Sequence, residues 1–380
     1  MTSRTTTTTR TLSHGTTAKV TSTGRVTSIH TASGATINRT SSGARTIVSS
    51  RGGRTVVTYG RGRGYVERPY RTIGGREYYQ RTYVFGGRSY AYAYGRYSWH
   101  GAYYYHYVPG FYFRPAFYGW VYNPWVSPVY YTWGWYHASW YLPYGYYFAP
   151  APYYPVASLW LTDYLLAENL QAAADAAAEA GGPAPQPAPL ASGAAPVLTP
   201  EIKQAIADEV KRQLDAEKTA AANPNAAPPT EQVPAALDPN NRTFIVSASL
   251  DVSAGDQQCS LAPGDVLTRI DDTADKDQNV TVLVNTSQKT DCPSGEKVTV
   301  AVNDLQEMHN QFQAQIDAGL KTLADNNGKN NLPKAPDTKT TSGAVPPPAA
   351  DNVQAEVNKQ QTEADQTEKE VKQEVSSKKS

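Results

Sequence analysis

The chain has 380 residues and a net charge of only +1, but residues 1–150 carry a net charge of +15 and the remainder a net charge of −14. Such a length suits about two domains, and two parts of opposite charge either attract each other or bind different partners. The first 162 residues hold only two acidic side chains, Glu67 and Glu77, and the six histidines are scattered. Neither a catalytic carboxylate pair nor a metal cluster can be assembled there, so we predict a protein that is not an enzyme and has no cofactor or metal.

Residues 1–20 are rich in threonine and serine, and we predict that they are disordered. Residues 21–98 repeat a short unit in which a glycine precedes five or six β-branched and polar residues. The units begin at Gly24, Gly34, Gly43 and Gly53, and return with more tyrosine at Gly75 and Gly87. A glycine turn followed by β-branched residues is typical of a β-hairpin. This region is therefore predicted to be a β-meander.

The stretch Thr23–Ile29, followed by Gly34, is similar to the β-hairpin repeats of YD-repeat (Rhs-type) bacterial surface proteins. The similarity covers about residues 23–60 and implies the same succession of hairpins. This chain departs from the repeats in one respect, because the Tyr-Asp pair that names them is missing. The alternative is a generic polar β-meander, and we favour it because short Gly-Thr-Val patterns are common in strands.

Arginine and glycine alternate at Arg61–Gly64, and three Gly-Gly-Arg triplets end at Arg54, Arg76 and Arg88. Arginines among tyrosines can bind a polyanion or single-stranded nucleic acid, because the cation neutralises phosphate and the rings stack on bases. The alternative is that the arginines lie at turns and strand edges, where charge discourages pairing between sheets. We favour the alternative, because the arginines follow the glycine turns and no recognised nucleic-acid motif accompanies them.

Residues 99–157 form a tyrosine- and tryptophan-rich module with no charged side chain between Arg114 and Asp163. Frequent prolines and glycines prevent a long helix. Any single ring is expected to pack in a core, but the module holds too many rings to bury them all, so we predict an exposed adhesive face. The candidate binding residues are Trp120, Trp125, Trp133, Trp135 and Trp140, which would stack on a polysaccharide or cell-wall polymer.

Two helices are predicted next, separated by linkers at 181–198 and 219–240. The first covers residues 158–180, and its apolar face is expected to pack on the aromatic module. The second covers residues 199–218, with Thr199 as N-cap and Pro200 at the first helical position. It has an apolar residue at every fourth position, which indicates a narrow docking stripe.

Residues 241–326 resemble a small globular domain, with strands predicted at 243–248, 250–253, 265–270, 279–285 and 296–302, and a helix from Asp304 to Leu323. The turn and strand at Pro263–Leu267 are similar to those of small SH3-like barrels. Cys259 and Cys292 are the only cysteines, and we predict a disulfide between them because an isolated pair in a small domain suits an oxidising compartment. Residues 327–380 are predicted to be a disordered or weakly helical tail that is acidic and contains lysine.

Four aspartates crowd one predicted turn of this domain: Asp271, Asp272, Asp275 and Asp277. They could bind calcium, but the spacing lacks the glycine and the terminal glutamate of an EF-hand loop. We therefore favour a solvated acidic loop.

The order of segments resembles a group of uncharacterised bacterial proteins that are predicted to be secreted. The resemblance is carried by Gly64–Tyr70, Arg114–Trp135, Ser158–Leu165, Leu198–Gln204 and Asp304–Met308. It implies secretion but no activity. No signal peptide is visible after Met1, and no stretch has the composition of a transmembrane helix. We nevertheless expect an extracytoplasmic location, in the periplasm, on the cell surface or outside the cell.

The fold class is therefore predicted to be mixed: a β-meander, an aromatic module, two helices on linkers, a small SH3-like barrel with a helix, and disordered tails. The function that we favour is a non-enzymatic structural or adhesive envelope protein that binds a surface polymer through its aromatic module. The alternative is a binder of nucleic acid or another polyanion through the arginine-rich region. The two differ in salt dependence, because only the second requires affinity to collapse as salt rises.

Overall fold

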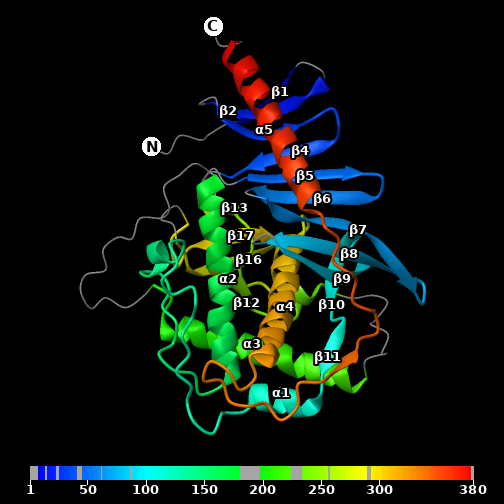
Figure 1. Ribbon diagram of the computed structural model, residues 1–380. Helices are drawn as coiled ribbons and strands as arrows, with labels where there is room; N and C mark the ends of the chain where they lie inside the picture. The colour runs from blue at the N-terminus through cyan, green and yellow to red at the C-terminus, as the bar shows by residue number, and fades with distance from the viewer. Residues whose placement is uncertain are drawn as a thin grey trace.

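The computed structural model describes residues 7–12, 15–22, 25–40, 45–60, 62–85, 88–179, 197–223, 233–255, 257–288 and 292–377 (Figure 1). Within these residues the chain forms three sheets and five α-helices. Figure 1 shows the first strands of a long meander crossed by the C-terminal helix, with the other helices and a second sheet beside the later strands.

The N-terminal sheet has ten antiparallel strands in sequence order, so the predicted meander is confirmed. Its strands are β1 (Thr7–Thr11), β2 (Thr17–Thr21), β3 (Val26–His30), β4 (Ala35–Arg39), β5 (Arg45–Arg51), β6 (Arg54–Gly60), β7 (Arg63–Ile73), β8 (Arg76–Phe85), β9 (Arg88–Trp99) and β10 (Ala102–Val108). Gly52 and Gly53 both have positive φ, which the tight turn between β5 and β6 requires.

The meander is longer than predicted at both ends. β1 and most of β2 form within residues 1–20, where we expected disorder, because threonine is β-branched and suits a strand. Residues 1–6 lie outside the described part. At the other end, β10 takes the first residues of the aromatic module into the sheet.

The C-terminal segment is not a disordered tail in the described residues 327–377. Helix α5 (Gln354–Ser377) packs its small apolar side chains, among them Ala364 and Val371, on a row of isoleucines that includes Ile37 and Ile47. The apolar stripe of α5 is too narrow to predict a stable helix in isolation, but the sheet covers it. Between α4 (Val302–Asp325) and α5 the chain runs back across the molecule and adds β18 (Thr340–Ser342) to β11 (Phe111–Phe113).

The opposite charges of the two ends of the chain attract each other within the molecule. Arg39 and Arg45 on the meander both bind Glu368 of α5, and Arg54 binds Glu356 of the same helix. The sequence left open that the two oppositely charged parts of the chain bind two different partners. These ion pairs show that the charges do not require such partners.

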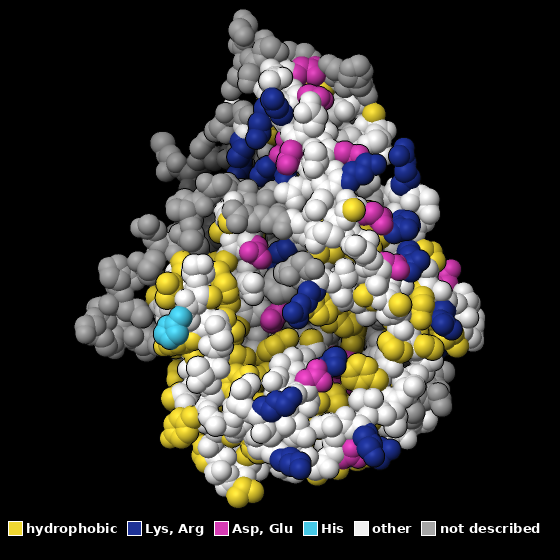
Figure 2. Space-filling view, viewed as in Figure 1, with side chains coloured by type: hydrophobic (Ala, Val, Ile, Leu, Met, Phe, Trp, Pro, Cys, Tyr) yellow, Lys and Arg dark blue, Asp and Glu magenta, His cyan; other side chains and the backbone are white. Residues whose placement is uncertain are grey.

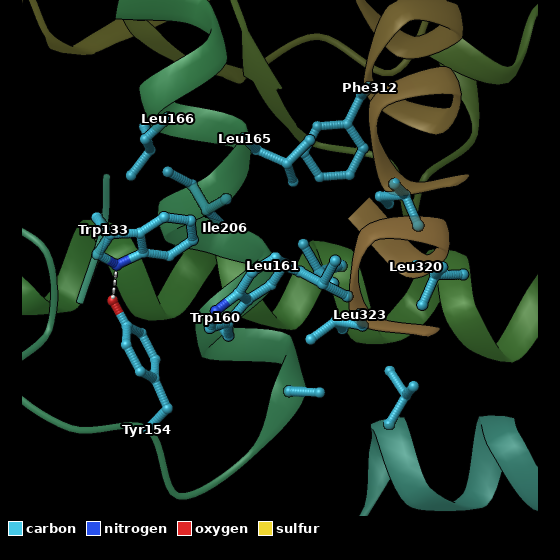
Figure 3. Close-up of a cluster of buried hydrophobic side chains, with 14 of the residues drawn as sticks. Trp133, Tyr154, Trp160, Leu161, Leu165, Leu166, Ile206, Phe312, Leu320 and Leu323 are labelled. Atoms are coloured by element: carbon cyan, nitrogen blue, oxygen red, sulfur yellow. Dashed lines mark hydrogen bonds between the residues drawn. The ribbon is translucent and has the colours of Figure 1, made fainter. Parts of the chain in front are cut away.

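The aromatic module folds with the central helices into one core. Its helices are α1 (Pro115–Tyr122), the 3₁₀ turn η2 (Leu142–Tyr144), α2 (Ala157–Glu179), α3 (Pro200–Ala222) and α4 (Val302–Asp325). Trp133 stacks on Trp160 of α2 at 4.9 Å between ring centroids, and its Nε1 donates to the Tyr154 hydroxyl (Figure 3). The prediction that this helix packs on the aromatic module is confirmed. Residues 180–196 and 224–232 of the predicted linkers lie outside the described part.

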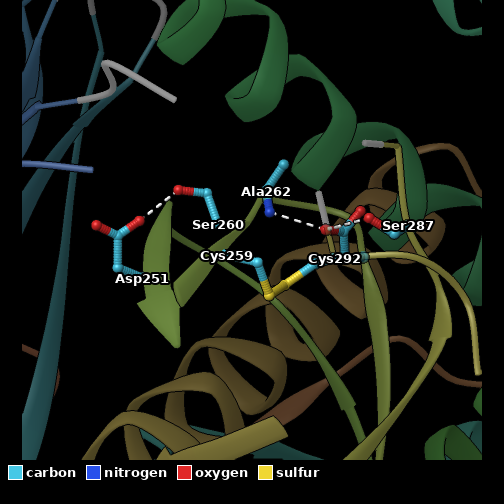
Figure 4. The surroundings of a disulfide bond; sticks show 7 residues. Asp251, Cys259, Ser260, Ala262, Ser287 and Cys292 are labelled. Carbon is cyan, nitrogen blue, oxygen red and sulfur yellow. Dashed lines mark hydrogen bonds between the residues drawn. A yellow bond between two sulfur atoms is a disulfide. The ribbon is translucent and has the colours of Figure 1, made fainter. Parts of the chain in front are cut away.

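The C-terminal sheet has the strand order β12-β15-β16-β17-β13-β14. Its strands are β12 (Thr243–Ile245), β13 (Leu250–Ala254), β14 (Gln257–Leu261), β15 (Val266–Arg269), β16 (Asn279–Thr286) and β17 (Lys297–Ala301). In the described residues its edge strands β12 and β14 do not pair, so the sheet is open and an SH3-like barrel is not confirmed. Cys259 and Cys292 form the predicted disulfide (Figure 4), with 5.2 Å between their Cα atoms.

Candidate functional site

The five candidate tryptophans lie together, but mostly inside. Trp125 and Trp133 are only 8% and 7% exposed and belong to the core. Trp120, Trp135 and Trp140 are partly buried and pack against the same core. The rings contact one another rather than forming an open platform, as the 5.2 Å between the centroids of Trp133 and Trp135 illustrates.

Tyrosines, rather than tryptophans, are the most exposed rings of the module. Tyr130 is 70% exposed and Tyr153 is 47% exposed, and their ring centroids lie 6.2 Å apart. Figure 2 shows hydrophobic side chains gathered on the side of the molecule where Figure 1 places this module. Neither ring lines the pocket described below.

A pocket of about 210 Å³ lies between the meander and the helices. Strands β5 to β9 form one wall, α2 and α4 form the opposite wall, and the β12–β13 connection contributes Ser247 and Ser249. Figure 1 shows the meander meeting α2 and α4 at this level. The pocket is therefore built from segments that are distant in the sequence.

Six tyrosines dominate the lining: Tyr59, Tyr65, Tyr83, Tyr90, Tyr92 and Tyr164. The register of the sheet explains this, because Tyr65, Tyr83 and Tyr90 are direct neighbours on β7, β8 and β9. Alternate residues of a strand point to the same face, so the tyrosines of the repeat unit meet on the side that faces the helices.

The buried phenol groups of Tyr59, Tyr65 and Tyr92 are neutral hydrogen-bonding groups. Burial raises the pKa of Tyr59, Tyr65 and Tyr92 above the ordinary value of 10.0. A neutral phenol can both donate and accept a hydrogen bond. The walls therefore combine apolar ring faces with hydroxyl groups.

Three of the four charged residues of the lining are engaged with neighbouring protein groups. Arg45 binds Glu368, Arg63 lies 3.5 Å from Asp175 and donates to a carbonyl oxygen of α2, and Glu307 accepts from Arg81 through both oxygens. Burial raises the pKa of the Glu168 carboxyl, and the charge of Arg63 opposes this effect. The pocket thus has no large excess of either charge.

Amide groups of α2 and α4 complete the lining. Asn169 donates to Gln315 at 3.0 Å. Within the described residues the side chain of Gln311 makes no hydrogen bond to the protein, although it is half-buried and lines the pocket. It can therefore donate to and accept from a bound molecule.

A second polar cluster lies deeper, where α3 meets α4. The carboxyl groups of Glu217 and Asp317 hydrogen-bond to each other, which requires a shared proton. Tyr107 donates to Asp317 at 2.5 Å, and Tyr118 donates to Glu217. Burial raises the pKa of Asp317 to about 7. Asp317 is almost fully buried, so this cluster joins helices and is not open to a ligand.

No group of three or more His, Cys, Asp or Glu in the described ranges is placed to hold a metal ion. The carboxylates of the acidic loop serve the loop itself. Asp271 accepts from the backbone of Thr281, Asp275 accepts from the backbone of Asp277, and Asp272 pairs with Arg242. Among the helices of the described segments, none is long and apolar enough to cross a membrane.

The pocket was not predicted from the sequence. The alternating tyrosines of β7 to β9 were visible as a strand pattern, but nothing local indicates that Gln311 or Glu168 would face them. No protein-family model, curated protein or solved structure matches this chain. The resemblance to secreted bacterial proteins therefore stays a prediction.

Proposed function

We propose that this protein is a non-enzymatic binding protein that holds one sugar unit of a neutral or weakly charged polysaccharide in the tyrosine-lined pocket. The observation that carries the proposal is the lining itself, which combines six tyrosine rings, amide and hydroxyl groups, and four charged groups of which three are already engaged with protein partners. The proposed function is still polymer binding through aromatic rings. The proposed binding residues are now tyrosines of the meander instead of the five tryptophans.

The chemistry of a sugar fits this lining. A sugar ring presents apolar C–H faces and hydroxyl edges, so it can pack on the tyrosine faces while its hydroxyl groups bond to phenols and amides. Pockets for drug-sized ligands usually measure about 300–1,000 Å³. At about 210 Å³ this pocket suits a single ring, with the rest of the polymer outside.

The charges of the lining favour a neutral ligand over a polyanion. A phosphate group gains most of its affinity from cations that it neutralises. Arg45 and Arg63 already lie beside carboxylates, so their charges are largely compensated before a phosphate arrives. The polyanion alternative is therefore the weaker proposal.

The same contacts support binding rather than hydrolysis. A glycosidase needs one carboxyl group as acid and a second as base or nucleophile. Glu168 and Glu307 both line the pocket, but each oxygen of Glu307 accepts a hydrogen bond from the Arg81 guanidinium. A carboxylate held in this way is a weak base and a hindered nucleophile.

An extracytoplasmic location belongs to this proposal. The Cys259–Cys292 disulfide supports it, because disulfides persist in oxidising compartments. Polysaccharides of the cell envelope or the exterior would then be the accessible ligands.

The test is retention of the full chain on insoluble neutral glycans, measured beside thermal melting. Tyr90→Ala removes a ring that is 40% exposed, and Gln311→Ala removes the amide without breaking a bond within the described protein. Each change is expected to weaken binding about tenfold and to leave the melting temperature within a few degrees of the wild type. Retention by the wild type should change little between low and high salt.

Matched controls make the same changes outside the pocket. Tyr103→Ala removes a ring that is 63% exposed on β10, and Gln366→Ala removes an exposed amide on α5. Both should bind as the wild type does. Equal losses in pocket and control variants, or release of reducing sugar from the glycan, would contradict the proposal.

A further inference from the structure

The two edge strands of the ten-stranded meander, β10 and β1, differ in whether their outward backbone groups are hydrogen-bonded. At the β10 edge, the side chain of Asn310 on α4 accepts from the backbone N–H of Tyr107 at 3.1 Å and donates to the carbonyl of Tyr105 at 2.9 Å. The amide thus occupies backbone groups that another strand would otherwise use. Such protection of an edge strand prevents further pairing.

The β1 edge has no comparable protection among the described residues. β1 pairs only with β2, and four of its five residues are exposed. It contains no proline and no bulge, and Arg10 is its only charged residue. An open strand edge of this kind is a ready template for another strand.

The hydrogen bonds between β1 and β2 identify which backbone N–H and C=O groups of β1 face away from β2. The backbone N–H of Leu12 donates to the carbonyl of Thr16, so these two residues form a hydrogen-bonded pair. Hydrogen-bonded and non-bonded pairs alternate along an antiparallel ladder. Arg10 and Thr8 therefore bond to β2, and the backbone groups of Thr7, Thr9 and Thr11 point away from it.

We propose that β1 pairs antiparallel with β1 of a second copy of this chain, about a twofold axis at Thr9. In this register Thr9 faces Thr9 of the other copy and Thr7 faces Thr11, so all the outward groups are used in about six hydrogen bonds. Thr8 faces Arg10, and no arginine faces an arginine. A cross-strand pair of like charges would be destabilising, so the sequence of β1 is compatible with pairing to itself.

The pairing produces a dimer to which no further copy can add. It is isologous, and the other edge of each meander is occupied by Asn310. Five residues of strand bury less than the roughly 1,200 Å² of a stable interface, so the dimer is weak and forms at high micromolar concentration or above. This inference is independent of the pocket and of its ligand.

Sedimentation of the full chain over a wide concentration range tests the pairing. Thr9→Pro removes the outward N–H, and the ladder to β2 does not use that group. We expect it to weaken dimerisation about tenfold or more, because the N–H of each copy is lost. Thr9→Val retains the N–H and should dimerise as the wild type does.

Charge changes at Thr8 test the register. Thr8→Arg places an arginine opposite Arg10 of the other copy and should weaken the dimer severalfold, whereas Thr8→Glu places a carboxylate there and should strengthen it severalfold. Dimerisation that is insensitive to Thr9→Pro and to both changes at Thr8 would overturn the proposal. A wild type that stays monomeric at millimolar concentration, or that forms open-ended fibres, would overturn it too.

Discussion

Arg45 on β5 and Glu368 on α5 are separated by 323 residues in the sequence and form a buried ion pair, with 3.2 Å between Nη1 and Oε2. Arg45 is 3% exposed, and Glu368 also binds Arg39 at 2.6 Å. Breaking a buried pair leaves an uncompensated charge, which is far more costly than losing a surface pair. This contact therefore holds the C-terminal helix on the N-terminal sheet.

Glu368→Gln should lower the free energy of unfolding by about 2 kcal/mol at pH 7, because both arginines lose a charged partner. Burial raises the pKa of Glu368, but the hydrogen bond and charge of Arg39 lower it by more, so its folded pKa lies below 4.5. Its contribution is complete above pH 4.5 and is lost as the pH falls through the folded pKa. Denaturant unfolding at several pH values should show the deficit shrinking below pH 4.5. Glu363→Gln, at an exposed site of α5, should show no deficit.

Asp317 should give the opposite pH dependence. Its folded pKa of about 7 lies above the ordinary 3.8, so the folded state holds a proton that the unfolded state releases, and stability falls as the pH rises from about 4 to 7. Asp317→Asn keeps the site neutral and should remove about 2 kcal/mol of this fall. Asp325→Asn, at a largely exposed position of the same helix, should retain the wild-type slope. If Asp317→Asn retained the wild-type slope of stability against pH, the carboxyl groups of Glu217 and Asp317 would share no proton.

Any side chain at Gly95 is expected to clash with the ring of His106. A Cβ at Gly95 would lie 2.3 Å from Cε1 of the His106 ring, which is directly opposite it in the sheet. Gly95→Ala should therefore cost about 1–3 kcal/mol by overpacking. The double change Gly95→Ala and His106→Ala should recover part of that loss relative to His106→Ala alone. Thermal melts of the four proteins give this coupling energy.

Trp133→Ala should destabilise the protein by about 3–5 kcal/mol, because the ring stacks on Trp160 inside the core. Trp133→Phe retains most of the buried surface and should cost less. Glycan retention measured well below the melting temperature should be unchanged in the phenylalanine variant. A stable Trp133→Ala protein that had lost glycan binding would return the binding site to the tryptophans.

The sequence predicts a part of this structure best where neighbouring residues in the chain determine that part. Glycine spacing and β-branched residues predict the meander, because turns and strands depend on short-range chemistry. The disulfide is predicted for another reason, because the chain has only two cysteines. The docking of α5 was missed because its valines and alanines form a weak stripe that only the isoleucine row stabilises. The pocket was missed for the same reason, since Tyr83 and Gln311 meet only after the sheet and α4 pack together.

The tryptophans illustrate a different limit. Composition correctly identifies the aromatic module as unusual, but it does not distinguish rings in a core from rings on a surface. Trp133 is buried because α2 supplies Trp160 and Leu161 as partners, which the sequence places in a separate helix. The tyrosines of the meander were interpreted as strand residues, although their shared face becomes the wall of the candidate site.

The most direct test of the proposed sugar site is hydroxyl-radical footprinting of tyrosines with and without a soluble neutral oligosaccharide that the protein binds. We expect that Tyr90, at the pocket, becomes protected, whereas Tyr103 on β10 and Tyr130 in the aromatic module keep their reactivity. Protection of Tyr130 and Tyr153 with unchanged reactivity at Tyr90 would contradict it, because the ligand would then lie on the aromatic module and not in the pocket.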